Sequence, residues 1–157
     1  MSVKIYDIKH LKIILIILEL CLEAQINEKY ELYENKLKEI INEYKNKESC
    51  FIIANEVGNL LRKFKLIDGS IYYYQKALQE IYPELKLQDS TKNQLILVMC
   101  NLASSLSVSQ KFVQSLQMYE QALQECIRFH GKESHQTKQI IESIQNLRSI
   151  IQKISQK

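Results

Sequence analysis

Residues that interrupt helices and strands are scarce in this sequence. Its 157 residues include only 3 glycines and 1 proline. The many tight turns of a β-sandwich or β-barrel depend on such residues, whereas long helices joined by short polar loops need few of them. The scarcity therefore predicts an all-α fold, and the chain is long enough for one domain with a buried core.

Blocks of charge of one sign are also missing. The chain has 21 Lys and Arg against 18 Asp and Glu, and the resulting formal charge of +3 is spread along the sequence. A protein that binds DNA or RNA through its phosphates concentrates basic residues on one surface. We therefore expect no nucleic-acid partner.

The motifs that mark common enzymes are absent as well: a glycine-rich phosphate loop, a GxSxG elbow and an HExxH zinc motif. The 4 cysteines lie far apart without a CxxC pair, which is typical of buried thiols in a reducing compartment. Cys126, His130 and His135 have metal-ligand chemistry, but a structural zinc site needs four ligands. The sequence predicts a cytoplasmic protein with no enzyme activity, cofactor or metal.

No apolar run is long enough to span a membrane. The very apolar segment Leu11–Leu22 is uninterrupted only from Ile13 to Leu18, far short of the ~20 residues of a spanning helix. We expect a buried or partner-covered helix from Tyr6 to about Glu23, with no membrane span. Association with a membrane surface and a cleaved signal peptide are the alternatives.

Apolar residues at spacings of three and four predict about seven helices separated by short polar joints. Pro83 is expected to end the fourth helix, because proline disfavours helical geometry in the residue before it. Asp89, Ser90 and Thr91 are candidate N-caps of the fifth. The predicted helices span about residues 6–23, 29–44, 51–65, 70–82, 112–129 and 137–154, and the fifth runs from the candidate caps at 89–91 to about 108.

A shift of 45 residues (122 − 77) aligns the second half of the chain with the segment before it. Small residues fall on small residues and aromatic on aromatic. The aligned pairs are Gly58 with Ala103, Leu61 with Leu106, Ser70 with Ser115, Tyr74 with Tyr119, Ala77 with Ala122 and Leu78 with Leu123. The same shift carries Asn101 onto Asn146, so the last helix matches the first half of a third unit.

This pattern resembles the tetratricopeptide repeat, in which a small residue on the first helix is followed by small, aromatic and small residues on the second. The segments Tyr72–Ile81 and Met118–Ile127 read like the family's second helix. The long period and the loop Gly131–Thr137 resemble the kinesin-light-chain type of repeat, although Ser134 and His135 stand where that type has His and Pro. The resemblance implies antiparallel helix pairs stacked as a short superhelix; an ordinary helical bundle is the alternative.

The first hairpin matches the repeat less well. A shift of 41 residues (74 − 33) places Tyr33 on Tyr74, but it also places the large Ile17 where Gly58 stands. Terminal repeats are usually atypical because they cap the stack. We therefore divide the chain into an N-terminal capping or diverged hairpin, residues 1–47, and tetratricopeptide-like repeats with a final capping helix, residues 48–157.

The first helices of the three units carry polar residues on one face, as their three-and-four spacing shows. The resemblance implies that this face lines a concave groove in which asparagine amides bind the backbone of a partner segment. The predicted binding residues are Asn55, Asn59, Arg62, Asn101, Ser104 and Asn146. A solvated polar face is the alternative reading, and Glu142 replaces the basic residue that the family's chaperone-binding members need.

A repeat without catalytic residues predicts an adaptor or scaffold subunit of a multi-protein complex, which binds a partner helix or an extended peptide. The alternative is a structural subunit built permanently into a large assembly, cytoskeletal or ciliary for example, through its helix faces. Both hypotheses imply protein partners.

The N-terminal helix is predicted to be an interface in its own right. It is apolar on nearly all sides, and one neighbouring helix covers only one face. Exposed apolar surface favours association. We expect another chain, either a different subunit or a second copy, to cover the side that contains Ile13, Ile16, Ile17 and Leu20.

Overall fold

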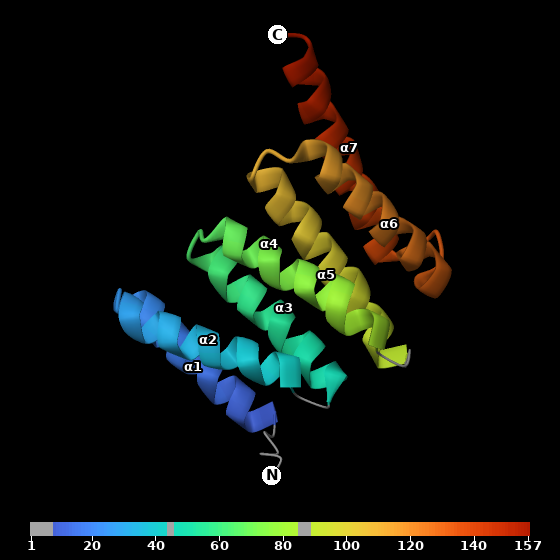
Figure 1. Cartoon of the computed structure of the whole chain (residues 1–157). Coiled ribbons are helices and arrows are strands. Elements are labelled where there is room, and N and C mark those ends of the chain that lie inside the picture. Colours follow the sequence, from blue (N-terminus) through green and yellow to red (C-terminus); the bar gives the residue numbers. More distant parts are fainter. Residues whose placement is uncertain (1–7, 44–45, 85–88) are drawn as a thin grey trace.

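The computed structural model describes residues 8–43, 46–84 and 89–157, and within them it is entirely helical (Figure 1). The α-helices are α1 (Ile8–Glu23), α2 (Asn27–Glu43), α3 (Lys47–Lys63), α4 (Ile67–Lys76), α5 (Asp89–Val108), α6 (Phe112–His130) and α7 (His135–Ser155). A π-helical turn, Ala77–Ile81, and a 3-10 turn, Tyr82–Glu84, extend α4. The predicted all-α class with about seven helices is confirmed.

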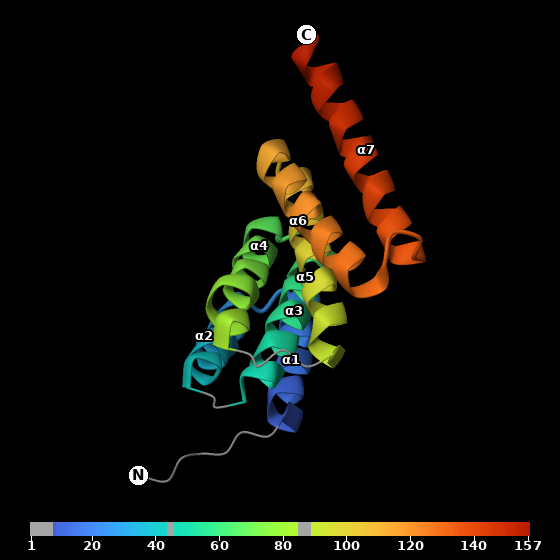
Figure 2. The same cartoon turned by 90° about the vertical axis from the view of Figure 1, so that its right-hand side faces the viewer.

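Helices that are neighbours in sequence pack against each other as the pairs α1/α2, α3/α4 and α5/α6. The pairs are joined side by side, because α1 contacts α3, α3 contacts α5, and α4 contacts α5. The last helix, α7, packs on α6, and its C-terminal part extends beyond the rest of the stack (Figure 2). The result is a row of helix pairs with α1 and α7 at opposite ends (Figure 1).

Each pair is closed by the same tight turn. Gln25, Lys65 and Gln110 all adopt a left-handed backbone, with φ of 57°, 61° and 60°. In the middle turn the N–H of Leu66 bonds the carbonyl of Leu61 at 2.8 Å, and that of Lys65 bonds Arg62 at 3.0 Å. This pattern is the Schellman motif, and the other two turns repeat it.

The turns also correct the sequence-based boundaries. The chain reverses at Phe64–Leu66 and α4 begins at Ile67, three residues before the predicted start at Ser70. The first two turns lie 40 residues apart (65 − 25), one fewer than the shift inferred from Tyr33, whereas the next spacing is the predicted 45 (110 − 65). The first hairpin therefore shares the turn geometry of the two later pairs.

The remaining boundary predictions concern the start of α5, the start of the first helix and the end of the second. α5 begins at Asp89, so Thr91 lies inside the helix with a buried side chain and does not cap it. The predicted start of the first helix at Tyr6 and the predicted end of the second at Tyr44 lie outside the described residues.

Small residues allow close packing within the pairs, although Gly58 faces Tyr74. An added methyl group at Gly58 would lie 2.5 Å from Cε1 of Tyr74, so the ring of this tyrosine fills the space above the glycine. In the next pair the Ser115 hydroxyl donates to the Ala103 carbonyl at 2.6 Å, which brings α6 against the backbone of α5. Tyr73 is also fully buried, and its hydroxyl donates to Glu34 on α2 at 3.0 Å.

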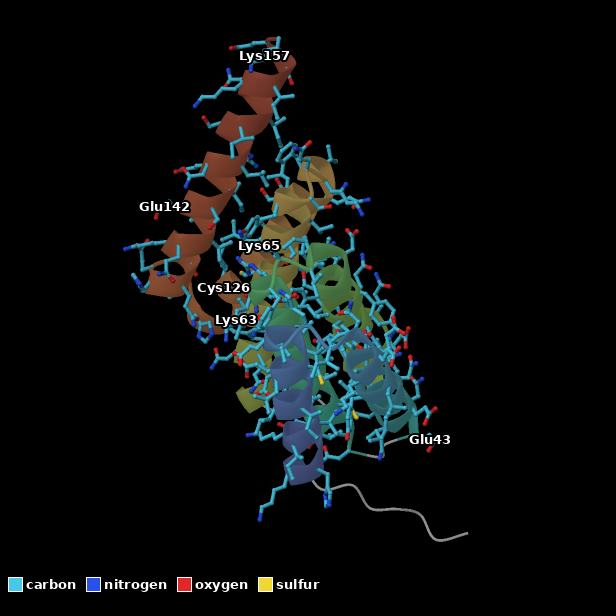
Figure 3. All side chains as sticks on the ribbon, turned by 90° about the vertical axis from the view of Figure 1, so that its left-hand side faces the viewer. Glu43, Lys63, Lys65, Cys126, Glu142 and Lys157 are labelled. Atoms are coloured by element: carbon cyan, nitrogen blue, oxygen red, sulfur yellow. The ribbon has the colours of Figure 1, made fainter. Side chains whose placement is uncertain are left out.

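The N-terminal helix is only half covered (Figure 3). Its inward residues Leu11 and Leu18 are fully buried against the core, whereas Ile13 is 54%, Ile16 55% and Leu20 57% exposed. Ile17 is half-buried. The predicted apolar outer face therefore exists, and a chain that covers it stays a prediction. In the described part of the molecule, every helix is too short or too polar to cross a membrane.

Candidate protein-binding groove

The predicted asparagines meet across the contact between α3 and α5. The Asn101 amide nitrogen lies 3.2 Å from the side-chain oxygens of both Asn55 and Asn59. Asn59 also accepts a hydrogen bond of 2.6 Å from the Tyr74 hydroxyl. Asn55 is only 7% exposed, so its amide serves the helix contact and does not face solvent.

One turn further along, Arg62 and Ser104 add another contact between α3 and α5. Together with Asn55, Asn59 and Asn101 they form what we call the polar seam. The Arg62 guanidinium donates to the Ser104 hydroxyl at 2.8 Å. The pKa of the Tyr74 phenol is raised by burial, and the nearby guanidinium partly offsets the rise. The polar seam therefore holds α3 to α5 through hydrogen bonds, and it fixes one wall of a hollow beside α5.

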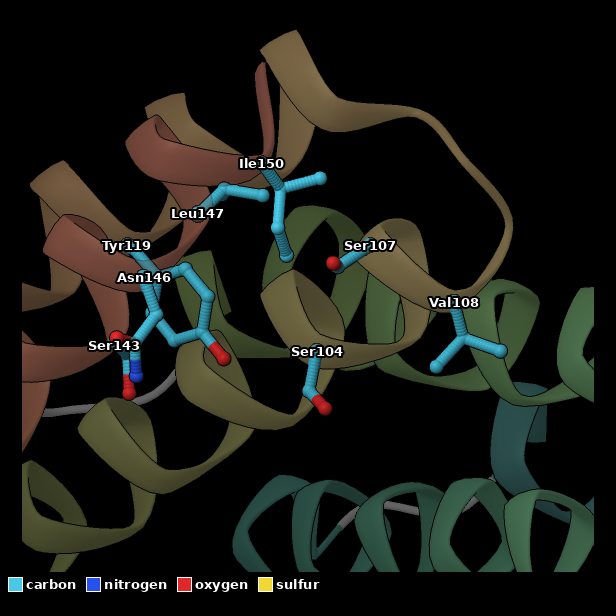
Figure 4. A pocket seen from close by; sticks show the side chains of 8 residues that line it. All are labelled: Ser104, Ser107, Val108, Tyr119, Ser143, Asn146, Leu147 and Ile150. Carbon is cyan, nitrogen blue, oxygen red and sulfur yellow. The ribbon is translucent and has the colours of Figure 1, made fainter. Parts of the chain in front are cut away.

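The hollow lies between α5 and α7, with α6 beneath it. It has two adjoining cavities of about 320 and 250 Å³ that share Ser104, Tyr119 and Ser143. In the smaller cavity, Tyr119, Ser143 and Asn146 gather on one side and Ser104 lies opposite them (Figure 4). Together the two cavities form one groove, which contains the predicted residues Arg62, Asn101, Ser104 and Asn146.

Several groove residues were not predicted from the sequence. The repeat aligns Tyr119 with Tyr74, yet Tyr119 lines the open groove while Tyr74 is buried over Gly58. The groove face of α7 continues at the three-and-four spacing of Asn146, which could have identified part of the set. The unpredicted residues are Asn93, Ile96, Leu97, Cys100, Ser107, Val108, Tyr119, Gln136, Gln139, Ile140, Ser143, Leu147 and Ile150.

The middle of the groove is polar and contains one charged group, Arg62, which bonds Ser104. Burial, with a contribution from the neighbouring Cys100, raises the pKa of Tyr119, and burial raises the pKa of the Cys100 thiol to about 11. Both groups are therefore protonated at neutral pH. Among the residues that line the two cavities, Arg62 is the one side chain that carries a charge.

Each cavity contains an exposed apolar residue of α5, although the larger one is also lined by Asn93, Gln136 and Gln139. Leu97 and Ile140 lie in the larger cavity, and Val108 and Ile150 lie in the smaller one. Leu97 and Val108 are 51% and 59% exposed, which is unusual for large apolar residues beside a cavity. They lie eleven residues apart on one helix, roughly 16 Å at a rise of 1.5 Å per residue.

The possible metal ligands of the sequence analysis do not form a site. Cys126 is buried and lies 3.4 Å from the Thr137 hydroxyl, whereas His130 and His135 are exposed. Within residues 8–43, 46–84 and 89–157, His, Cys, Asp and Glu side chains nowhere gather in threes that could hold a metal ion.

Amides, hydroxyls and exposed apolar side chains suit the binding of a chain segment. They supply hydrogen-bond donors and acceptors along the groove and an apolar contact in each cavity. No family model, no curated protein and no solved structure matches the chain, so its function is inferred from the geometry of this groove.

Proposed function

We propose that this chain is a non-enzymatic protein-binding domain of the tetratricopeptide type, acting as an adaptor or scaffold subunit of a multi-protein complex. It binds an extended segment of a partner protein in the groove between α5 and α7. The observation that carries the proposal is the groove itself, which has a polar middle with one charge, at Arg62, and an exposed apolar residue of α5 in each of its two cavities.

An extended segment fits the dimensions of the groove. Such a segment rises by about 3.3 Å per residue, so two apolar side chains about five residues apart reach from Leu97 to Val108. Between them, the hydroxyls of Ser143 and Tyr119 and the amide of Asn146 can pair with the backbone of the partner.

The polar seam gives the groove a fixed wall and one point of charge preference. Asn101 donates to Asn55 and Asn59, so the three amides hold the wall. Arg62 donates to Ser104 and also lines the larger cavity. It favours a partner segment with an acidic side chain in its middle, because Ser104 belongs to both cavities.

A peptide-binding experiment tests this function. The full-length chain is used to select peptides from a random display library, and the enriched peptides are titrated by fluorescence anisotropy. Asn146→Arg places a long charged side chain at the groove and should weaken binding at least about tenfold. Gln145→Arg is the matched control, because Gln145 is the exposed neighbour on α7 and does not line the groove.

Two results would contradict the proposal. One is that the library yields no peptide that binds in solution. The other is that Asn146→Arg and Gln145→Arg bind the selected peptides equally well, which would place their site elsewhere on the molecule.

The exposed apolar face of α1 favours a second candidate, a structural subunit that meets its assembly through helix faces. A subunit of this kind depends on its partners to cover such a surface. A chain that is insoluble when purified alone supports this second function, whereas a well-behaved chain that binds selected peptides supports the adaptor.

A further inference from the structure

The outward face of α1 has a regular arrangement that the groove does not use and that points to a particular partner. Lys9, Ile13, Ile16, Leu20 and Glu23 follow one another at spacings of four and three, and all five are exposed. This spacing aligns them along a single seam of the helix, as in the contact seam of a coiled coil. This α1 seam is apolar in the middle and charged at both ends.

The α1 seam cannot turn into the protein's own core. The opposite side of α1 is held by Leu11 and Leu18, which are fully buried. The Lys63 ammonium on α3 also donates to the Glu19 carboxylate at 2.7 Å, and Lys63 lies at the C-terminal end of α1 (Figure 3). Because α1 is fixed in this orientation, its apolar seam faces outward.

The charges on this face are divided between its ends. Lys9 and Lys12 belong to the N-terminal part of α1, and Glu19 and Glu23 belong to the C-terminal part. Lys9 and Glu23 each lie seven residues from Ile16, so an antiparallel copy centred on Ile16 places Lys9 opposite Glu23 twice. A parallel copy would place like charges together, which disfavours association.

We propose that a second copy of this chain packs its α1 antiparallel on the first, with Ile16 at the two-fold axis. Ile13 of each copy then lies beside Leu20 of the other, and the charged ends form intermolecular ion pairs. The antiparallel helix dipoles are also favourable in this arrangement. The contact is isologous and closes on itself, so it produces a dimer and not a filament.

Sedimentation equilibrium of the full-length chain over a range of concentrations tests the dimer. Wild type should show a reversible monomer–dimer equilibrium. Ile16→Lys brings two cations together at the axis and should raise the dissociation constant at least about tenfold. Leu32→Lys is the matched control, since Leu32 is 66% exposed on α2 and outside the seam, and it should dimerise like wild type.

A charge exchange tests the antiparallel register and the identity of the partner. Lys9→Glu should weaken the dimer, and the double variant Lys9→Glu with Glu23→Lys should restore it. Only a second copy supplies both changed charges at once. Circular dichroism should show the same helix content for all variants, because the substituted residues are exposed.

Three results would overturn the inference: a wild-type chain that stays monomeric at high concentration, a dimer insensitive to Ile16→Lys, or a double variant that is not restored. A monomer that binds lipid vesicles through α1 would assign the face to a membrane surface instead. Asn146→Arg should still dimerise, so failure of the groove hypothesis is distinguishable from failure of this one.

Discussion

Close packing at one glycine decides how α3 and α4 approach each other. An ideal methyl group at Gly58 would lie 2.5 to 2.9 Å from three ring atoms of Tyr74. The Tyr74 ring is fully buried and its hydroxyl is bonded to Asn59, so it has little room to move aside. We expect Gly58→Ala to lower the free energy of unfolding by about 1–3 kcal/mol, despite the better helix propensity of alanine. Urea unfolding measures the change.

Gly69→Ala is the control for this prediction. An added methyl group at Gly69 meets only the end of the Leu61 side chain, at 2.9 Å. This flexible group can rotate, so the loss should be small or absent. Equal losses for the two variants would show that the Tyr74 ring does not set the cost at Gly58.

In the three Schellman turns, the residue at the left-handed position is of a type that does not favour this backbone conformation. Left-handed backbone is unfavourable for residues with a Cβ atom, by roughly 1–2 kcal/mol, and glycine is the usual occupant of this position. Here the position is held by Gln25, Lys65 and Gln110. The fold therefore retains some strain in each helix pair.

Gln110→Gly should relieve part of this strain and raise the free energy of unfolding by about 0.5–1 kcal/mol, the gain being reduced by the greater entropy of the unfolded glycine. Gln110→Ala keeps the Cβ atom and should bring no gain. Urea midpoints of the two variants are compared with wild type. If alanine stabilised the chain as much as glycine, the loss of the glutamine side chain would be the cause and not relief of the turn.

At the scale of the whole molecule, burial of weak acids makes stability depend on alkaline pH. Burial raises the pKa of a set of phenols and thiols, and it raises the pKa of the two thiols, Cys50 and Cys100, to about 11. The groups are Tyr30, Cys50, Tyr73, Tyr74, Tyr82, Cys100 and Tyr119. Their contribution is complete below the pKa values of the unfolded chain and is lost as the pH rises above them.

We therefore expect the melting temperature to be nearly constant from pH 7 to about 8 and to fall above that, first as thiols and then, more steeply, as phenols ionise in the unfolded chain. Tyr73→Phe provides the check. It loses the hydrogen bond to Glu34 and should be less stable than wild type at pH 7. Its deficit should shrink at pH 10 and above, because it has no phenol to ionise. A deficit independent of pH would contradict the assignment.

Much of the fold could be predicted from local pattern alone. Helix content follows from apolar spacing and from the scarcity of glycine and proline, because both act within a few residues of chain. The chain turns at Lys65, ahead of the joint predicted between helices 51–65 and 70–82, because the usual glycine is absent from the turn, whereas Gly69 lies inside α4. The aligned small residues Ala103 and Ser115 meet where α5 packs on α6.

The candidate site divides in the same way between sequence and tertiary structure. Helix periodicity shows from the sequence which side chains share a face, which places Asn101 beside Ser104. The bonds from Asn101 to Asn55 and Asn59 depend on how α3 packs on α5. The position of α7 on α6 is the reason that Tyr119 lines a groove while Tyr74 is buried. Periodicity fixes the direction of a side chain on its own helix, but its exposure depends on which other helix covers that direction, and that helix comes from a distant part of the chain.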